Sequence, residues 1–399
     1  MTVPSGRHCR GPGIPGKVSV VASYLDAPRL VEDGHRHYGR FLRTPIANPY
    51  DARPLSASWR DVPTLTRLVS AVGGFVDEYA LRAYEWFRTK EWVGFTLIHP
   101  ELFGSMIIQD AKYLASSELY VYDRETGGLT QHAANRMGGS LRLPADLLHR
   151  ACAFDASKNR PLGRDEPAHD YSRLSSLYRL GYAFDADEVV VAIDIDASES
   201  GPGVHGRLDL DPRRASAPLA VSARLPGGSL YTNKIVYPAS GVITCGERRY
   251  VFDPDRDFAI LDEHKSHLPY RTRWTWGTFA MRTPDGIAGA NFATRPSVPG
   301  QEEESCVWTP DAAEPLSDVA FTPLGDGDDA PWRIRSTDGR LDVVFTPEGR
   351  KGVDQFLIAA ELHYVQRFGH YDGTLTSAAG TTWTVDGVHG VCEQMDARL

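Results

Sequence analysis

Hydrophobic residues in this chain come mostly in short runs, each about as long as a β-strand and bounded by turn residues. The first three runs span residues 92–98, 103–109 and 114–123. His99-Pro100 follows the first run, and a turn sequence at residues 125–128 follows the third. Runs of this length separated by tight turns predict a meander of antiparallel strands.

The same pattern returns after a polar, proline-bearing stretch at residues 159–169, which we interpret as a loop. Further strand-like runs span 188–195, 207–210, 219–225, 230–237, 242–244, 250–252, 258–261, 271–279, 332–335, 341–345, 356–365, 373–375 and 383–385. Many short strands with frequent turn signals favour barrels or sandwiches over a doubly wound sheet. We therefore expect a mainly β chain.

Three segments depart from this pattern. Residues 1–60 are rich in Pro, Gly and Arg with little periodicity, and they predict an irregular N-terminal arm that wraps the body. Apolar residues at mixed helical spacing predict a short helix within residues 64–88, interrupted by Gly73-Gly74. A second short helix is expected at residues 144–153, where Pro144 would lie near the first turn.

The chain has 399 residues, which is long for one core, so we expect two units or one large one. Residues 296–305 contain proline and acidic residues and few apolar ones, as linkers do. We interpret Glu302, Glu303 and Glu304 as part of this solvated linker. The expected division is an N-terminal arm plus a larger barrel in residues 1–300 and a smaller barrel in residues 301–399.

Composition and charge then narrow the classes of function. The net charge of −9 disfavours nucleic acid as a partner, because phosphates need a basic surface. No run of 18 apolar residues is present, so we expect no stable membrane insertion, and the N-terminus lacks a secretory h-region, so we expect a cytoplasmic protein. Dinucleotide, phosphate-loop, zinc-protease and α/β-hydrolase signatures are absent from the sequence, and we expect no cofactor.

The densest group of chemically active residues lies in residues 262–276. The candidates for acid/base chemistry are Asp262, Glu263, His264, His267 and Tyr270. Such groups titrate near neutrality when they are buried or coupled to other charges. A solvated loop with local salt bridges is the competing interpretation, and a metal site on the two histidines and two carboxylates is a weaker one; we expect no metal.

Four further residues are candidates for contacting a substrate. Period-2 alternation places Trp274 and Trp276 on one face of a strand, where they could form an aromatic wall. Lys234 lies mid-strand among apolar residues, and would be functional if it points inward and harmless if it points outward. His363 belongs to a polar group at residues 363–373, for which a polar strand edge closing the second barrel is the favoured alternative.

An ordered set of short motifs resembles a bacterial domain-of-unknown-function family, number 2804. The motifs lie at residues 42–45, 84–87, 232–234, 239–242, 259–265, 269–276, 331–334, 342–347 and 366–373. The resemblance covers most of the chain from about Phe41 onward. The sequence departs from the family pattern at Ser266-His267, where family members commonly have a glycine and an aromatic residue, which draws attention to His267.

The resemblance implies paired lipocalin-like antiparallel β-barrels, similar in outline to carotenoid hydratases and to lipocalin-like cyclases that promote Diels–Alder reactions. Those proteins act without an organic cofactor on large apolar molecules, and by position Asp262 matches the acid of the hydratase branch. This implies an enzyme, a cyclase, isomerase or hydratase/lyase, that acts on an apolar natural-product-like molecule in a barrel cavity. The alternative is a non-catalytic carrier of a hydrophobic ligand, and a structural or protein-binding module is least favoured. The sequence predicts no oligomeric state.

Overall fold

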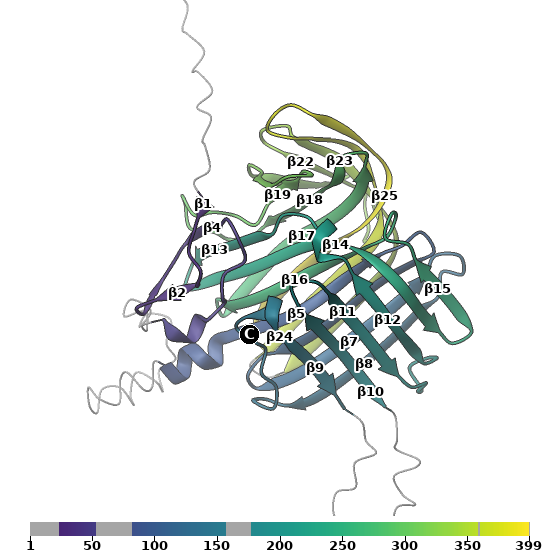
Figure 1. Cartoon of the computed structure of the whole chain (residues 1–399), viewed down its shortest axis with the longest axis horizontal. Coiled ribbons are helices and arrows are strands. Elements are labelled where there is room, and N and C mark those ends of the chain that lie inside the picture. Colours follow the sequence, from purple (N-terminus) through teal and green to yellow (C-terminus); the bar gives the residue numbers. More distant parts are fainter. Residues whose placement is uncertain (1–23, 53–81, 157–176, 358–359, 399) are drawn as a thin grey trace, which may run out of the picture.

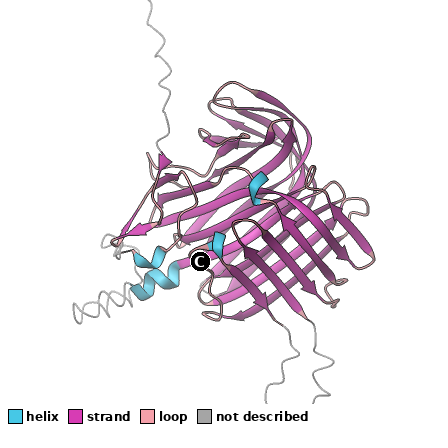
Figure 2. Ribbon diagram, viewed as in Figure 1, coloured by secondary structure: helices cyan, strands magenta, loops and turns pink. Residues whose placement is uncertain are grey.

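The fold is taken from a computed structural model that describes residues 24–52, 82–156, 177–357 and 360–398. Strands dominate the described residues, as Figure 2 shows, and they form two large curled antiparallel sheets. The prediction of a mainly β chain with two antiparallel barrels is confirmed, each sheet being curled into a half-barrel. Figure 1 shows the sheets stacked, with β9–β12 at one end of the view and β22–β23 at the other.

The larger sheet contains fourteen strands within the described residues. Its main path, in spatial order, is β8 (Leu129–Met137), β7 (Leu114–Asp123), β6 (Leu102–Asp110), β5 (Thr89–Ile98), β16 (Phe258–His267), β14 (Gly228–Cys245), β12 (Val204–Leu210), β11 (Val189–Ile195), β10 (Tyr178–Phe184) and β9 (Ala151–Asp155). Four strands branch from this path: β1 (Tyr24–Leu25), β4 (Gly39–Phe41), β13 (Leu219–Leu225) and β15 (Arg248–Phe252). The described part of the N-terminal arm therefore joins the sheet, because β4 pairs with β13.

The second sheet contains nine strands within the described residues. Their spatial order is β20 (Ala313–Pro315), β19 (Cys306–Trp308), β18 (Gly286–Thr294), β17 (Arg271–Thr283), β25 (Thr382–Arg398), β24 (Ala360–Thr376), β23 (Leu341–Leu357), β22 (Trp332–Ser336) and β21 (Val319–Pro323). A separate two-stranded ladder joins β2 (Val31–Glu32) to β3 (His35–Arg36).

Helical structure is sparse in the described part of the chain, and one expected helix is wrong. Within residues 144–153 only the 3-10 turn η3 (Leu147–His149) forms, and Ala151 begins strand β9, which pairs with β10. Cys152 and Phe154 are buried in the barrel core while Ala151 and Ala153 are exposed, so strand pairing overrides local helix propensity. Residues 82–88 are helical, whereas most of the helix predicted over 64–88 and the loop at 159–169 fall outside the described residues. The described residues also contain the 3-10 turns η1 (Pro49–Asp51) and η5 (Pro212–Arg214).

The change from one sheet to the other occurs between β16 and β17, at residues 268–270 rather than near residue 300. Strands β17 and β18, which the sequence placed with the first barrel, belong to the second sheet because β17 pairs with β25 at the far end of the chain. Residues 296–305 are not a solvated linker throughout, since Glu304 and Ser305 are buried. Sequence composition does not report such long-range strand pairing.

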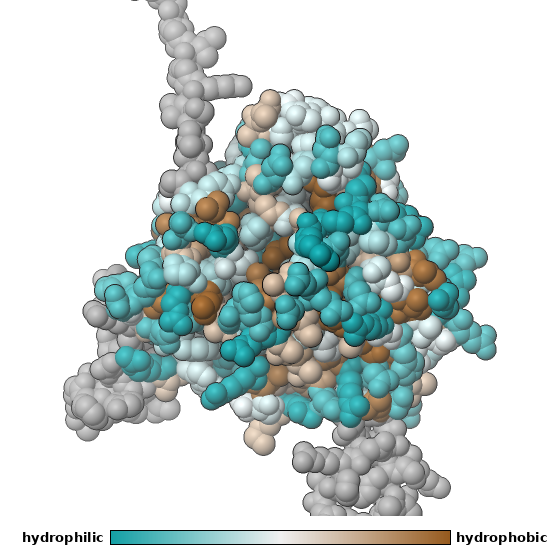
Figure 3. All heavy atoms as spheres, viewed as in Figure 1, coloured by the Kyte–Doolittle hydropathy of each residue, from teal (hydrophilic) through white to brown (hydrophobic). Residues whose placement is uncertain are grey.

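Three of the apolar clusters define where a site can lie. One fills the curve of the first sheet and another fills the curve of the second. A third joins the two sheets, with Val236 and Ile260 from the first and Trp276 and Val391 from the second. On the face drawn in Figure 3, hydrophilic side chains cover most of the surface, with small hydrophobic patches between them. Among the described residues, no helix is long and apolar enough to cross a membrane.

Candidate functional site

Strand register brings the central candidate residues together. In the antiparallel pair of β14 and β16, Lys234 lies opposite Asp262 and Thr232 lies opposite His264. On the other side of β16, Trp92 of β5 lies opposite His264. Because side chains alternate between the faces of a strand, Asp262 and His264 share the face that meets the second sheet. Asp262 therefore lies at the junction of the two sheets, where it lines a cavity together with Trp276 and Glu393 of the second sheet.

The carboxylate of Asp262 contacts three side chains. Lys234 Nζ lies 2.5 Å from Asp262 Oδ1, and His264 Nε2 lies 3.2 Å from the same oxygen. Trp92 donates its indole N–H to Oδ2 at 3.3 Å. Burial alone would raise the pKa of Asp262, but the Lys234 ammonium and His264 outweigh it and hold that pKa well below its usual value. Asp262 is thus ionised at neutral pH.

The segment between β18 and β19, two strands of the second sheet, supplies a second carboxylate near Lys234. Glu304 Oε2 lies 3.7 Å from Lys234 Nζ and 4.0 Å from His264 Nε2. The other oxygen of Glu304 pairs with Arg295. Burial would raise the pKa of Glu304, yet Arg295, Lys234 and His264 together lower it. Lys234 is 1% exposed, so this ammonium is enclosed by two carboxylates rather than hydrated.

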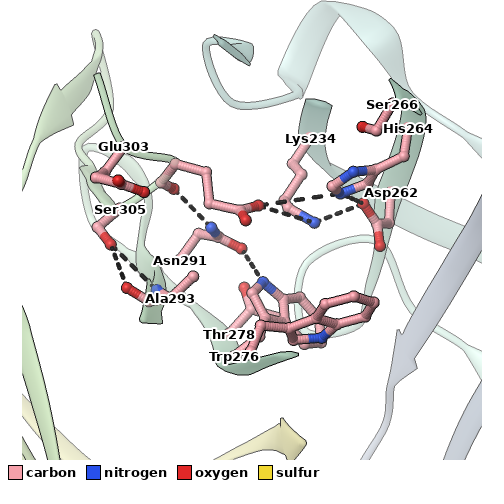
Figure 4. A network of polar contacts seen from close by, with 12 residues as sticks. Lys234, Asp262, His264, Ser266, Trp276, Thr278, Asn291, Ala293, Glu303 and Ser305 are labelled. Carbon is pink, nitrogen blue, oxygen red and sulfur yellow. Dashed lines mark hydrogen bonds and ion pairs between the residues drawn. The ribbon is translucent and has the colours of Figure 1, made fainter. Parts of the chain in front are cut away.

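Aromatic rings form the walls of the site. Lys234 Nζ lies 4.8 Å from the centre of the Trp276 ring, a cation–π distance. His264 stacks on Trp92, with ring centres 4.2 Å apart, and Trp92 stacks on Trp274 at 6.5 Å. Trp276 is fixed in turn by donating its indole N–H to Asn291 Oδ1 at 2.8 Å. Figure 4 shows Lys234, Asp262 and His264 from one sheet facing Trp276 and Asn291 from the other.

Glu393 of β25 is a third carboxylate at the same cavity. It accepts hydrogen bonds from the Trp274 indole at 2.8 Å and from Tyr364 and Gln366 at 2.7 Å each. Among the described residues, no cationic side chain forms an ion pair with it. Burial raises the pKa of Glu393, opposed in part by these three donors, so the pKa shifts of Glu393 and Asp262 have opposite signs.

The cavity that these residues line is small, with a volume of about 40 Å³. Its lining is Trp92, Leu225, Leu230, Lys234, Asp262, His264, Leu268, Thr272, Trp274, Trp276, Arg295, Glu304 and Glu393. Ligand pockets for drug-sized molecules usually measure roughly 300–1,000 Å³. A substrate larger than a few atoms must therefore displace wall side chains, and the three leucines form the apolar part of that wall.

The comparison with protein families identifies the chain. The family model described as "Domain of unknown function (DUF2804)" matches residues 74–399. The chain belongs to this family. The resemblance expected from the sequence motifs is thereby confirmed.

This DUF2804 protein was also compared with solved structures and with curated proteins. The crystal structure of kievitone hydratase from Nectria haematococca is similar to it with a TM-score of 0.45 and 9% sequence identity. The similarity covers 77% of this chain and 88% of that chain. No match was found among curated proteins.

Five of the residues expected from the sequence meet at the cavity of this DUF2804 protein: Lys234, Asp262, His264, Trp274 and Trp276. Glu263 does not join them, because alternation turns it to the opposite face of β16, inside the first barrel. There Asn233 donates to Glu263 Oε2 at 3.2 Å, Oε1 has no hydrogen-bond partner, and burial raises the pKa of Glu263 to about 7.

Three other expected residues also lie away from this cavity. His267, at the end of β16, lines a different cavity. Tyr270 is 51% exposed in the crossover between the sheets and lines neither cavity. His363 lies on the exposed face of β24, where ion pairs with Asp354 and Glu361 raise its pKa. Its neighbour Tyr364 takes the inward position and contacts Glu393, as strand alternation requires.

Sequence reasoning missed Trp92, Arg295, Glu304 and Glu393 as site residues. Glu304 was assigned to a solvated linker on composition, and its burial depends on Arg295, which no local pattern reveals. Glu393 carried a signal, because a carboxylate directly after the apolar pair Val391-Cys392 interrupts a strand-like run.

Proposed function

We propose that this protein is a cofactor-independent enzyme that uses acid/base chemistry on a small apolar, unsaturated molecule, as a cyclase, isomerase or hydratase/lyase. The observation that carries the proposal is the Asp262 carboxylate, which Lys234 holds ionised at 2.5 Å in a cavity walled by three tryptophans. A charged group kept at an apolar, aromatic wall is costly to a fold and is typical of catalytic sites. Location in the cytoplasm remains a prediction.

The opposite pKa shifts of Asp262 and Glu393, two carboxylates that line the same cavity, divide the roles. Asp262 is ionised and can only accept a proton, so it serves as the base. The pKa of Glu393 is raised, so it retains a proton more readily and serves as the donor. Paired carboxyl groups whose environments separate their pKa values are a recurrent acid/base arrangement. The resemblance to the hydratase branch had suggested Asp262 as the acid; its contacts favour the reverse role.

The remaining groups bind and orient the substrate. His264, between Asp262 and Glu304, is placed to pass a proton between the base and the second carboxylate. The faces of Trp274 and Trp276 hold an unsaturated chain and stabilise positive charge that develops on it. Leu225, Leu230 and Leu268 contact the apolar body once they move aside to admit it.

Solvent isotope exchange tests this proposal even when the product has not been identified. The protein would be incubated in D2O with a panel of unsaturated apolar compounds and with an extract of the organism that encodes it. Deuterium incorporation into each compound would be measured by mass spectrometry. Asp262→Asn should lower exchange into the active compound at least a hundredfold and Glu393→Gln at least tenfold. The exposed Asp285→Asn serves as control and should exchange like the parent. Exchange that both site variants retain in full would refute the proposal.

A non-catalytic carrier of a hydrophobic ligand is the second candidate. It is favoured by the pairing of Asp262 with Lys234, which neutralises the cavity and lets an apolar ligand enter without facing an unpaired charge. A carrier would retain a compound from the host extract with no deuterium exchange. Asp262→Asn would then alter binding modestly and leave no activity to lose.

A further inference from the structure

A second, larger cavity lies where the N-terminal arm and the helix at residues 82–88 meet the first sheet. Its volume is about 480 Å³, within the usual range for small-molecule sites. It shares no lining residue with the cavity at Asp262. The residues that matter here are Arg36, Tyr38, Tyr50, Trp86, Arg224 and His267.

Arg36 is a half-buried guanidinium that no carboxylate neutralises. Its Nε donates to Ser222 Oγ at 3.1 Å and its Nη1 to Ser229 Oγ at 2.7 Å. Its Nη2 is buried and has no hydrogen-bond partner. Within the described part of the chain, no Asp or Glu lies within ion-pair distance of Arg36. Buried arginines are normally paired with an anion, so this side chain is set up for one that comes from outside.

Arg224 is a second arginine directed at the same place. Its Cζ lies 4.6 Å from the centre of the Tyr38 ring, and the Cζ of Arg36 lies 6.0 Å from that same ring. Arg224 is exposed, and it too has no carboxylate ion pair among the residues that the structure describes. Both guanidinium groups therefore lie near the same aromatic ring at the cavity wall.

The surroundings of His267 show the same excess of positive charge. Burial, Arg88, Arg36 and Lys90, in that order, lower the pKa of His267 to about 4. The ring is thus neutral near pH 7 and can donate one N–H. The cavity also includes Arg82 and the carboxylate Glu85, each of which already has interactions of its own.

We propose that this cavity binds a small organic oxyanion on a flat apolar body. The oxyanion is held by Arg36 and Arg224, whose planar guanidinium groups suit both carboxylate and phosphate oxygens. The flat body lies against the rings of Tyr50 and Trp86, and the ring of Tyr38 packs against both arginines. This binding does not depend on the reaction proposed at Asp262.

Calorimetric titration of the full chain with three small aromatic compounds of similar shape tests the proposal. Benzoate and phenyl phosphate carry the oxyanion on a flat ring, and benzamide is the neutral match. At least one anion should bind, and benzamide should bind at least tenfold more weakly. If only one anion binds, that result identifies which oxyanion the site accepts.

Single substitutions test whether the anion binds in this cavity. Arg224→Met changes an exposed side chain and should weaken anion binding at least tenfold, as should Arg36→Met if it folds. Arg249→Met, an exposed arginine on β15, should leave affinity unchanged. The proposal is overturned if neither anion binds, if benzamide binds equally well, or if Arg224→Met retains full affinity. Asp262→Asn should leave anion binding intact, which separates this result from the fate of the proposed reaction.

Discussion

Lys234 and Asp262 lie directly opposite each other on neighbouring strands, and the ammonium is 2.5 Å from the carboxylate. The sequence separates the two residues widely, and it is the antiparallel register of β14 and β16 that makes them partners. With Glu304 at 3.7 Å on the other side and the Trp276 ring at 4.8 Å, the ammonium has little contact with water. A charge in this position is tolerated because its partners replace its hydration.

Removal of this ammonium should destabilise the fold. Lys234→Met leaves Asp262 and Glu304 facing each other without the cation between them. We expect the free energy of unfolding to fall by about 3–5 kcal/mol, the usual cost of breaking a buried ion pair from one side. Urea denaturation of the parent and the variant would measure it. The double variant Lys234→Met/Asp262→Asn should recover part of the loss; a loss that is equal in the single and double variants would contradict the assignment.

A substitution of Glu304 tests whether residues 296–305 form a solvated linker or are partly buried. In a solvated linker, Glu304→Gln would change the free energy of unfolding by less than about 0.5 kcal/mol. Because Glu304 is 4% exposed and compensates Arg295 and Lys234, we expect instead a loss of about 2–4 kcal/mol. The exposed Glu199→Gln is the matched control and should unfold like the parent. Equal denaturation curves for the two variants would restore the linker interpretation.

The strands and the site differ in how far the sequence reveals them. Strands are recognised from a local pattern, the alternation of apolar and polar residues. Most strands and the shared face of Trp274 and Trp276 could therefore be predicted. Lys234 also stood out, as a cation in an apolar run. Which face of a strand meets the second sheet depends on contacts between distant segments, and the pairing of β17 with β25 sets those contacts.

The same reason explains the residues that were misplaced. His267 and Glu263 are neighbours of Asp262 and His264 in sequence, yet alternation and the end of β16 direct them to other places. Glu393 comes from the last strand and reaches the site only through the fold. Proximity along the chain is thus a weak guide to a site in a sheet, where the residues that meet come from facing strands.

Glu263 should make stability depend on pH. Burial raises its pKa to about 7 from an ordinary value of 4.5. Because the folded pKa lies above the unfolded one, the bound proton stabilises the fold fully below pH 4.5, and this contribution is lost as the pH rises through about 7. Glu263→Gln should remove this part of the pH dependence and be more stable than the parent at pH 8, by on the order of 1–3 kcal/mol.

The measurement for Glu263 compares urea midpoints of parent and variant at pH 5 and pH 8. The difference between the two proteins isolates this one carboxyl from the others that titrate in the same range. Glu247→Gln, an exposed substitution, should follow the parent at both pH values. A Glu263→Gln variant whose stability falls with pH as steeply as that of the parent would show that Glu263 is not the group responsible.

Leu268 should control access to the tryptophans of the small cavity. It is 4% exposed, lies where the chain passes between the sheets, and packs with Leu225 and Leu230 beside Trp92. Leu268→Ala should cost about 2–4 kcal/mol in stability, as truncation of a buried leucine does, and should open the cavity wall. Quenching of tryptophan fluorescence by acrylamide, a small neutral molecule, would report the opening as a larger quenching constant. Leu324→Ala, at an exposed leucine, should leave quenching unchanged, and equal quenching constants for the two variants would mean that entry to the cavity lies elsewhere.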